Sequence, residues 1–276
     1  MIGTDISITF TVDHSVVFNS WVGRFVNRVV SEVLEDVGYR VSHASSKPFI
    51  VSPVFDLRSR IVNGFSPGFP YRFRASFFCN EVDCGRIIDA FAKPSITLLS
   101  GEVLSTVRVI VNEVSLNEDH STDAASIMHW RVRYWPTIFT FRSHYIAWPS
   151  PARFLASAAQ TLAHLLEGSK VDMINGNESF LGLINGIDLK QLVKDLLFNT
   201  DTVNVKARQI RLNLGNGRWI NAFSGYAEYI TYTEKPSLMK TLLSVANTYG
   251  VGKDRALGLG YVNSELINQQ VIKSKD

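Results

Sequence analysis

The spacing of hydrophobic residues changes several times along the chain, and each change marks a predicted element. Residues 5–12 alternate and are rich in β-branched side chains, which indicates a strand. Over residues 16–37 the apolar positions recur every three or four residues, which indicates an amphipathic helix that ends at Gly38. The first half then continues with strand-like stretches at 39–54, 57–61 and 71–78, a short helix at 84–92 and a strand at 103–114.

The pattern restarts after a polar segment at 115–126. A strand is predicted at 131–142, followed by helices at 151–167 and 185–198, strands at 201–213 and 218–233, a helix at 237–249 and a strand at about 259–265. Strand, helix, strand, strand, helix, strand is thus the order in both halves, with an insertion after the second half's first helix. This order is the ferredoxin-like unit. We predict an α+β protein with two tandem ferredoxin-like (RRM-like) domains, 1–126 and 127–276, whose antiparallel sheets carry helices on one face.

Composition supports an ordinary globular protein and excludes few functions. The chain has 276 residues, of which 46% are hydrophobic and 19% charged, which suits two folded domains without charge-driven disorder. Cys79 and Cys84 are too few for a zinc site, and leave open two thiols or a disulfide. The N-terminus does not have the pattern of a signal peptide, and no apolar run reaches membrane-spanning length. We therefore expect a cytoplasmic protein without membrane contact.

A glycine-rich segment follows the last predicted helix and carries two cations. Residues 250–260 are Gly-Val-Gly-Lys-Asp-Arg-Ala-Leu-Gly-Leu-Gly, so that Gly250, Gly252, Gly258 and Gly260 flank Lys253 and Arg255. Glycines in this pattern can free backbone amides for an anion, and the cations add charge-assisted contacts to phosphate. A helix cap at Gly250 followed by a turn is the purely structural alternative. The segment leads into a strand and ends without Lys-Ser/Thr, so neither the dinucleotide fingerprint nor a Walker loop applies.

This segment resembles the glycine-rich loop of the CRISPR-associated repeat-processing endoribonucleases of the RAMP superfamily (the Cas-six family). Further stretches are similar to that family: LLSVANTYGVGKDRALGLGYV at 242–262, FSGYAEY at 223–229, PTIFTF at 136–141, PSPARF at 149–154 and HASSKPF at 43–49, the last followed by Ser52-Pro53. The resemblance implies a double ferredoxin-like fold, CRISPR repeat RNA as the partner, and RNA cleavage without a metal or cofactor. It also implies that His43 is the active-site histidine.

The residues around His43 suit metal-independent RNA cleavage. In this chemistry the RNA 2′-hydroxyl attacks the adjacent phosphorus, so the protein has to move protons and stabilise phosphoryl charge. Histidine suits proton transfer, and a lysine such as Lys47 suits charge stabilisation. His43 as an exposed loop residue without a role is the alternative, and Tyr39 and His14 are further candidates for the catalytic set. The histidines of the chain form no recognisable metal-ligand spacing.

Basic residues outside the glycine-rich segment also form groups that can follow an RNA backbone. Arg24 and Arg28 are four apart on one predicted helix, while Arg131 and Arg133 share a strand face beside Trp135. On another strand Lys206 and Arg208 share a face, with Arg211 on the opposite one. Each group alone is more typical of a solvated surface, but together with the glycine-rich segment the groups could follow a phosphate backbone. Trp219 is expected in the core, with base stacking as the alternative.

Two other functions stay open on the sequence alone. The first is a non-catalytic RAMP subunit that holds guide RNA in a CRISPR effector complex, against which His43 argues weakly. The second is a ferredoxin-like enzyme for a small anion, which would need an enclosed apolar pocket and not an open basic groove. The sequence does not decide between a monomer and a homodimer.

Overall fold

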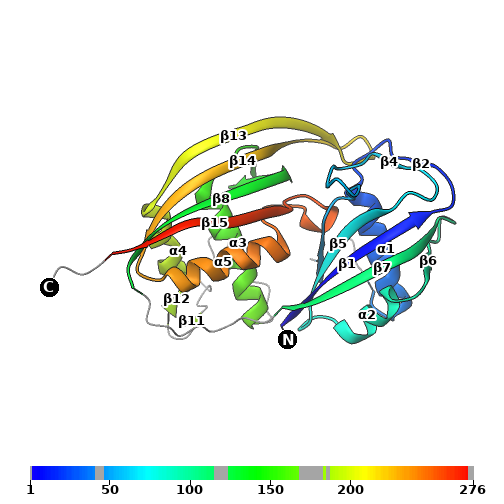
Figure 1. Cartoon of the computed structure of the whole chain (residues 1–276), viewed down its shortest axis with the longest axis horizontal. Helices are drawn as coiled ribbons and strands as arrows, with labels where there is room; N and C mark the ends of the chain where they lie inside the picture. Colours follow the sequence, from blue (N-terminus) through cyan, green and yellow to red (C-terminus); the bar gives the residue numbers. More distant parts are fainter. Residues whose placement is uncertain (1, 41–46, 115–123, 168–182, 185–186, 273–276) are drawn as a thin grey trace. The chain divides into compact units, whose positions relative to one another are not determined.

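The computed structural model describes residues 2–40, 47–114, 124–167, 183–184 and 187–272 (Figure 1). The chain forms two compact units. Unit 1 contains residues 1–115, 211–220 and 254–259, and unit 2 contains the remaining segments, 116–210, 221–253 and 260–276. The predicted division at residue 126 differs from these units, because the turn of the late hairpin and part of the glycine-rich segment pack with the first half of the chain.

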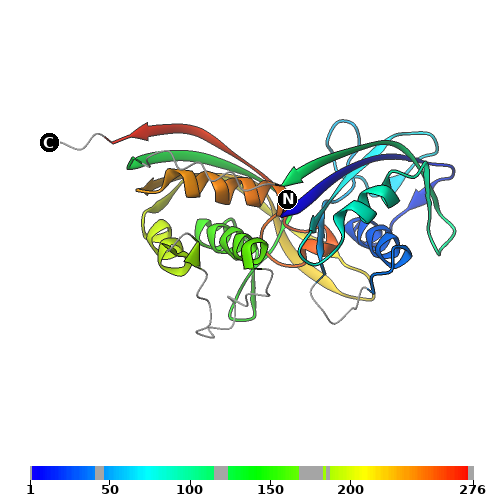
Figure 2. The ribbon, with the colours of Figure 1, turned by 90° about the horizontal axis from the view of Figure 1, so that it is seen from below.

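Unit 1 is built on a five-stranded sheet. Its elements are β1 (Gly3–Val12), β2 (Val16–Val17), α1 (Gly23–Asp36), β3 (Phe49–Val51), β4 (Gly64–Phe65), β5 (Tyr71–Phe78), α2 (Cys84–Phe91), β6 (Ser95–Thr97) and β7 (Val103–Val114). The strand order is β3-β5-β1-β7-β6, and β1 pairs antiparallel with β5 and with β7. Helices α1 and α2 lie on one side of this sheet (Figure 2).

Unit 2 repeats this arrangement. Its elements are β8 (Ser126–Thr137), β9 (Phe139–Phe141), β10 (His144–Ile146), α3 (Pro151–Glu167), β11 (Leu183–Ile184), β12 (Ile187–Asp188), α4 (Leu189–Phe198), β13 (Thr200–Asn213), β14 (Trp219–Thr233), α5 (Pro236–Tyr249) and β15 (Val262–Val271). A 3₁₀-helix, η1 (Arg255–Leu257), precedes β15 in the chain but belongs to unit 1. The order β13-β14-β8-β15 matches β3-β5-β1-β7 of unit 1. The predicted α+β fold with two ferredoxin-like sheets is therefore confirmed.

In the first half, one predicted helix starts later than expected and one predicted strand is wrong, each for a local reason. The helix expected over 16–37 begins only at Gly23, because Val16 and Val17 pair with β4. The strand expected at 57–61 is a turn, in which the Asp56 carboxylate accepts hydrogen bonds from the backbone amides of Arg58 and Arg60. An aspartate that bonds to amides two and four residues later stabilises a turn in place of a ladder.

The apolar faces of the strands bury two aromatic cores. In unit 1, Phe10 of β1 lies among the rings of Phe25, Phe65 and Phe73. In unit 2, Trp130 of β8 stacks against Tyr229 and Phe154, and its indole N–H donates to Thr231 Oγ1 at 2.9 Å. Strand alternation sends these rings to the helix side and leaves the other face of the unit 2 sheet to polar side chains.

A disulfide joins Cys79 to Cys84 and settles the alternative that the sequence left open. It closes the turn between β5 and α2. Within this turn the Asp83 side chain accepts from the amides of Gly85 and Arg86, which caps α2.

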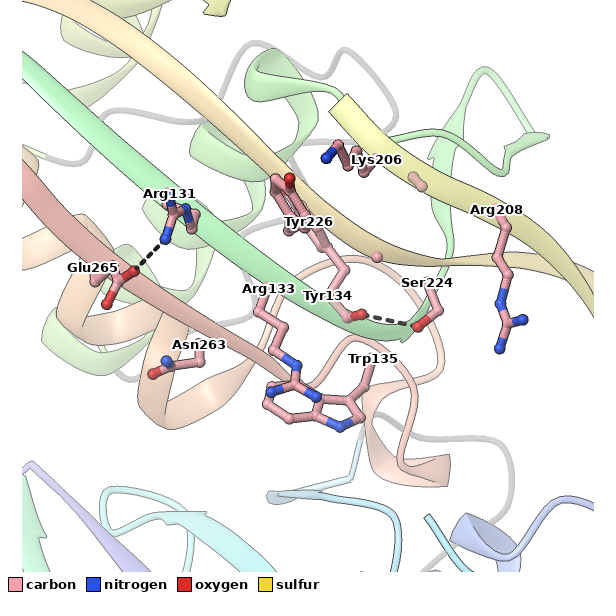
Figure 3. A pocket seen from close by; sticks show the side chains of 12 residues that line it. Arg131, Arg133, Tyr134, Trp135, Lys206, Arg208, Ser224, Tyr226, Asn263 and Glu265 are labelled. Atoms are coloured by element: carbon pink, nitrogen blue, oxygen red, sulfur yellow. Dashed lines mark hydrogen bonds and ion pairs between the residues drawn. The ribbon is translucent and has the colours of Figure 1, made fainter. Parts of the chain in front are cut away.

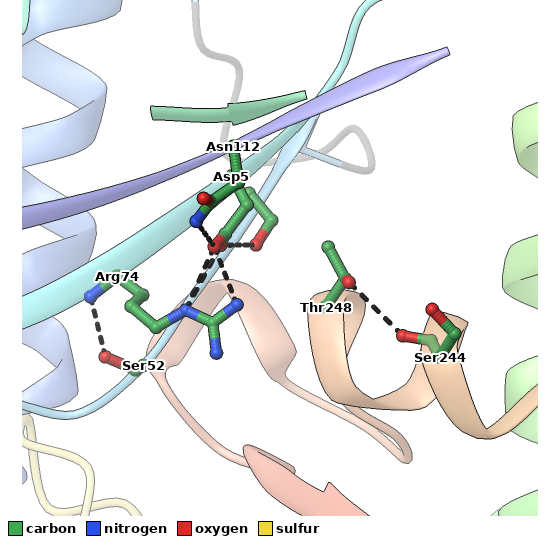
Figure 4. A network of polar contacts seen from close by, with 7 residues as sticks. Asp5, Ser52, Arg74, Asn112, Ser244 and Thr248 are labelled. Carbon is green, nitrogen blue, oxygen red and sulfur yellow. Dashed lines mark hydrogen bonds and ion pairs between the residues drawn. The ribbon is translucent and has the colours of Figure 1, made fainter. Parts of the chain in front are cut away.

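One buried ionic network crosses the unit 1 sheet on the side away from the helices (Figure 4). Asp5 of β1 is 3% exposed, and its carboxylate accepts from Arg74 Nη2 at 2.7 Å and from Ser76 Oγ at 2.8 Å. Asn112 Nδ2 of β7 lies 3.5 Å from the same carboxylate. The network thus ties β1 to both neighbouring strands through side chains.

Asp5→Ala should lower the free energy of unfolding by about 3 kcal/mol, because it leaves the half-buried Arg74 without its counter-ion. Urea denaturation followed by circular dichroism measures this loss. Asp201→Ala, at an exposed strand position, should change stability by less than about 0.5 kcal/mol. Equal losses in the two variants would contradict a structural role for the Asp5 network.

Candidate nucleic-acid interface

The glycine-rich segment has the backbone that its sequence predicts. Gly250, Gly252, Gly258 and Gly260 all have φ between +64° and +86°, a region that side chains with a Cβ rarely adopt. A Cβ on Gly252 would lie 2.3 Å from the carbonyl oxygen of Ile138, and one on Gly250 would lie 2.6 Å from that of Gly260. These glycines therefore allow one stretch of backbone to pack directly on another.

The expected role of the glycine amides is not supported. The amide of Gly250 donates to Ala246 O, that of Gly258 to Arg255 O and that of Gly260 to Pro136 O. The amide of Gly252 donates to Ser157 Oγ at 2.8 Å. Since all four amides are used inside the protein, a phosphate could gain contacts from this segment through its cations and not through these glycine N–H groups.

The two cations of the segment differ in their surroundings. Lys253 is exposed, and its ammonium lies 5.3 Å from the centre of the Tyr145 ring. Arg255 begins η1, and burial lowers the pKa of its guanidinium to about 10. Of these two cations, Lys253 is therefore the one that is freely accessible to a ligand.

Helix α1 and the residues just before it pack against η1 and donate hydrogen bonds to its backbone. The indole N–H of Trp21 donates to Leu257 O at 2.7 Å, and Asn27 Nδ2 donates to Ala256 O at 2.7 Å. Gly23, the first residue of α1, has no room for a side chain, since a Cβ there would lie 2.0 Å from Leu257 O. The helix N-terminus and η1 are thus held in direct backbone contact.

The candidate catalytic Lys47 joins the same cluster. Its ammonium donates to Asn27 Oδ1 at 3.1 Å and to Ser31 Oγ at 3.2 Å. Burial lowers the pKa of Lys47, and the nearby Glu35 acts in the opposite direction. Asn27 therefore connects Lys47 to the backbone of η1. His43, the other candidate, lies outside the described residues, whereas Tyr39 accepts a hydrogen bond from Asp83 N.

The remaining cations predicted on α1 and at the late hairpin serve packing as well as charge. Arg28 pairs with Glu102 at 3.1 Å, and Arg24 packs against Gly215 in the β13–β14 turn. Arg211 lies over the ring of Trp219 at 4.9 Å, and that indole is 52% exposed. The expectation that Trp219 belongs to the core is therefore wrong: it covers one face of the arginine at the surface.

The cations of the unit 2 sheet gather around one hollow of about 970 Å³ on the polar sheet face (Figure 3). Strand alternation places them there, because Arg131 and Arg133 of β8 are exposed while Val132 and Tyr134 are buried. The lining also includes Trp135, Lys206, Ala207, Arg208, Ser224, Gly225, Tyr226, Asn263 and Glu265. Two cation pairs that the sequence analysis treated separately thus face one space.

Carboxylates balance part of this charge. Arg131 Nε donates to Glu228 Oε1 at 2.8 Å, and Arg131 Nη1 lies 3.4 Å from Glu265 Oε1. The bond to Glu228 raises the pKa of Arg131, so this guanidinium is always charged but already paired. Lys206 lies 5.8 Å from the centre of the Tyr226 ring. Arg133, Lys206 and Arg208 are the lining cations best placed to meet an incoming phosphate.

The two residues of β15 that line this hollow, Asn263 and Glu265, were not predicted from the sequence. Asn263 and Glu265 stand two residues apart on the strand that follows the glycine-rich segment, and both are exposed. Their alternation with buried Val262 and Ser264 was visible in the sequence, but their partner β8 lies about 130 positions earlier. The pairing of β15 with β8 alone puts them beside Arg131 and Arg133.

The sequence that forms this hollow and the glycine-rich segment is similar to a known protein family. Residues 133–262, which include most of the hollow and the whole glycine-rich segment, match the family model "CRISPR-associated endoribonuclease Cas6". This match spans just under half of the chain. The family resemblance inferred from the glycine-rich segment is therefore confirmed. No curated protein matches the chain.

Solved Cas6 structures share the fold over nearly the whole chain. The product complex of Cas6 TTHB231, from Thermus thermophilus, has a TM-score of 0.67 at 16% identity and covers 95% of this chain and 100% of that one. A product complex and a substrate-mimic complex of Cas6 TTHA0078 give 0.64 and 0.63, again at 16% identity, over 95% and 96% of this chain and 99% and 100% of those chains. These likenesses establish a shared architecture of two ferredoxin-like domains.

The part of the chain that the structure describes has neither a membrane-spanning helix nor a cluster of metal ligands. There, no helix has the length and apolar character needed to cross a membrane. Within the same residues, no three or more His, Cys, Asp and Glu side chains gather in a way that could hold a metal ion.

The close packing of the glycine-rich segment predicts that Gly252→Ala destabilises the protein far more than Gly217→Ala. Both glycines have positive φ, so both variants lose about 1 kcal/mol from backbone strain. Only Gly252 faces a carbonyl oxygen within 2.3 Å, whereas Gly217 has open space around it. We expect a further loss of at least about 2 kcal/mol for Gly252→Ala, measured by thermal or urea unfolding. Similar losses for both would show that the segment can move aside.

Proposed function

We propose that this chain is a metal-independent endoribonuclease of the Cas6 family that binds and cleaves CRISPR repeat RNA, the precursor of crRNA. The RNA 2′-hydroxyl attacks the adjacent phosphorus, and the 5′-oxygen of the next nucleotide leaves. The products carry a 2′,3′-cyclic phosphate and a 5′-hydroxyl. The family match over residues 133–262 supports this proposal most strongly.

The hollow on the unit 2 sheet supports a polyanionic partner. Arg133, Lys206 and Arg208 all line it, and the hollow lies on a sheet face and not inside a core. An enzyme for a small anion would need an enclosed apolar pocket, which these lining residues do not form. Clustered cations beside aromatic rings are the composition that single-stranded nucleic acid prefers.

Lys47 and His43 carry the proposed chemistry. His43 moves a proton at the 2′-oxygen or at the leaving 5′-oxygen, since imidazole titrates near neutrality. Lys47 stabilises negative charge on the phosphoryl oxygens. Asn27 and Ser31 fix the lysine ammonium, and burial lowers its pKa. As pH rises through that lowered pKa the lysine loses its charge, so cleavage should decline earlier than an ordinary lysine would predict.

The proposal also includes protein partners. A Cas6-RT-Cas1–Cas2 complex contains a chain whose fold matches 98% of this one with a TM-score of 0.59, although this chain spans only 47% of that protein in the partial complex. Association with a CRISPR effector complex, as a monomer or a homodimer, remains our expectation. A RAMP subunit that binds guide RNA without cutting it is the alternative function.

Cleavage of labelled repeat RNA in excess chelator tests the chemistry. The wild type should cut, and His43→Ala should be slower by about 10²–10⁴, the usual contribution of one proton-transfer group. His144→Ala, at an exposed histidine of β10, should cut at the wild-type rate. RNA with one 2′-deoxy nucleotide at the cut should stay intact. Unchanged cutting by His43→Ala would assign the chemistry to other residues, and binding without any cutting would favour the subunit alternative.

The salt dependence of RNA binding tests the hollow. Lys206→Ala combined with Arg208→Ala should reduce the slope of log K against log salt by about 1.4, at roughly 0.7 for each lost contact to a single strand. Filter binding between 50 and 300 mM salt measures the slope. Lys194→Ala with Lys240→Ala removes two exposed cations from helices α4 and α5 and should leave the slope unchanged. Equal slopes for all three proteins would place the RNA elsewhere.

A further inference from the structure

An acidic side chain in a phosphate-binding hollow needs an explanation. Glu265 lines the hollow beside the amide of Asn263, and its side chain is 55% exposed. A carboxylate repels phosphate, so it weakens the binding that the surrounding cations provide. Glu265 is not needed to neutralise Arg131. Glu228 already binds that guanidinium at 2.8 Å, and Glu265 lies farther from it, at 3.4 Å.

The other wall of the hollow offers a flat surface. The Arg133 guanidinium lies over the Trp135 indole, with 4.7 Å between the guanidinium carbon and the ring centre. Tyr261 packs at 4.9 Å against the same indole. Figure 3 shows the Arg133 guanidinium over the indole, and both side chains line the hollow. Nucleobases stack on arginine planes as well as on aromatic rings.

We propose that this hollow is a subsite for one unpaired nucleotide of the RNA, and that it prefers guanine. The base stacks on the Arg133 guanidinium, and its edge is read by Glu265 and Asn263 of β15. The flanking phosphates lie against Lys206 and Arg208 on the β13 side. This inference rests on the proposed function and names the base that the same RNA-binding surface selects.

Hydrogen-bond chemistry selects the base. A carboxylate only accepts, so it favours an edge that presents two neighbouring donors. Guanine has such an edge in its N1–H and N2–H groups. Cytosine and adenine place a ring-nitrogen acceptor beside their amino group, and the single N–H of uracil stands between two carbonyl oxygens. Only guanine can therefore bind Glu265 through two hydrogen bonds, while the Asn263 amide can serve the guanine O6 as a donor.

Binding of short labelled RNAs tests the preference. The probes are uridine hexamers with a single central G, A, C or U, which cannot form a stem, and the readout is fluorescence anisotropy. The wild type should bind the G probe about tenfold more tightly than the U probe, as one bidentate contact to a base predicts. Glu265→Gln should reduce this preference to below twofold and leave the affinity for the U probe unchanged or slightly higher. Glu234→Gln, at an exposed carboxylate after β14, should keep the wild-type preference.

Arg133→Lys tests the stack separately from the charge. Lysine keeps the cation but has no plane, so every probe should bind about three- to tenfold more weakly while the salt slope stays the same. Equal wild-type affinity for the G and U probes, or a preserved preference in Glu265→Gln, would overturn the guanine subsite but leave the proposed function standing. Failure of the wild type to bind any probe or the repeat RNA would sink both proposals. Glu265 and Arg133 are exposed, so both variants should fold, and circular dichroism is the measurement that checks this.

Discussion

Direct contact between backbones at the glycine-rich segment is the constraint on which the candidate site depends. Gly252 lies against the carbonyl of Ile138, Gly23 against that of Leu257, and no side chain fits in either place. The segment contributes to both compact units, because residues 250–253 and 260 pack in unit 2 and residues 254–259 in unit 1. The segment is rich in glycine because its backbone packs where a Cβ would not fit, and not because its amides are free to bind a ligand.

This packing has a consequence for the chemistry proposed at Lys47. Asn27 binds the carbonyl of Ala256 through one atom of its amide and the Lys47 ammonium through the other. The position of η1 and that of the lysine are therefore linked through one side chain. A segment that first suggested phosphate binding by its amides instead acts as a structural support, and Lys253 is the cation through which it could still contact the proposed RNA.

The hollow on the unit 2 sheet contains carboxylates as well as cations, and the two kinds of charge would affect a nucleic acid differently. Cations alone would hold any polyanion, and Glu228 reduces that attraction at Arg131 by pairing with it. Glu265 lies farther from that guanidinium, at 3.4 Å, and in the proposed guanine subsite its place among the cations serves selection between bases and not greater affinity. Affinity and selectivity would then come from opposite walls of one space, β13 and β15.

The sequence by itself determined the order of elements, the alternation that exposes Arg131 and Arg133, and the four positive-φ glycines, because these depend on local spacing and backbone sterics. It also carried the family resemblance, through residues close together in the chain. Only the tertiary structure decided what those elements meet: that β15 pairs with β8, that the glycine amides are spent inside the protein, that Cys79 bonds to Cys84, and that Trp219 is exposed. Such outcomes depend on contacts between residues distant in sequence, and local periodicity holds no record of which strand becomes the neighbour of which.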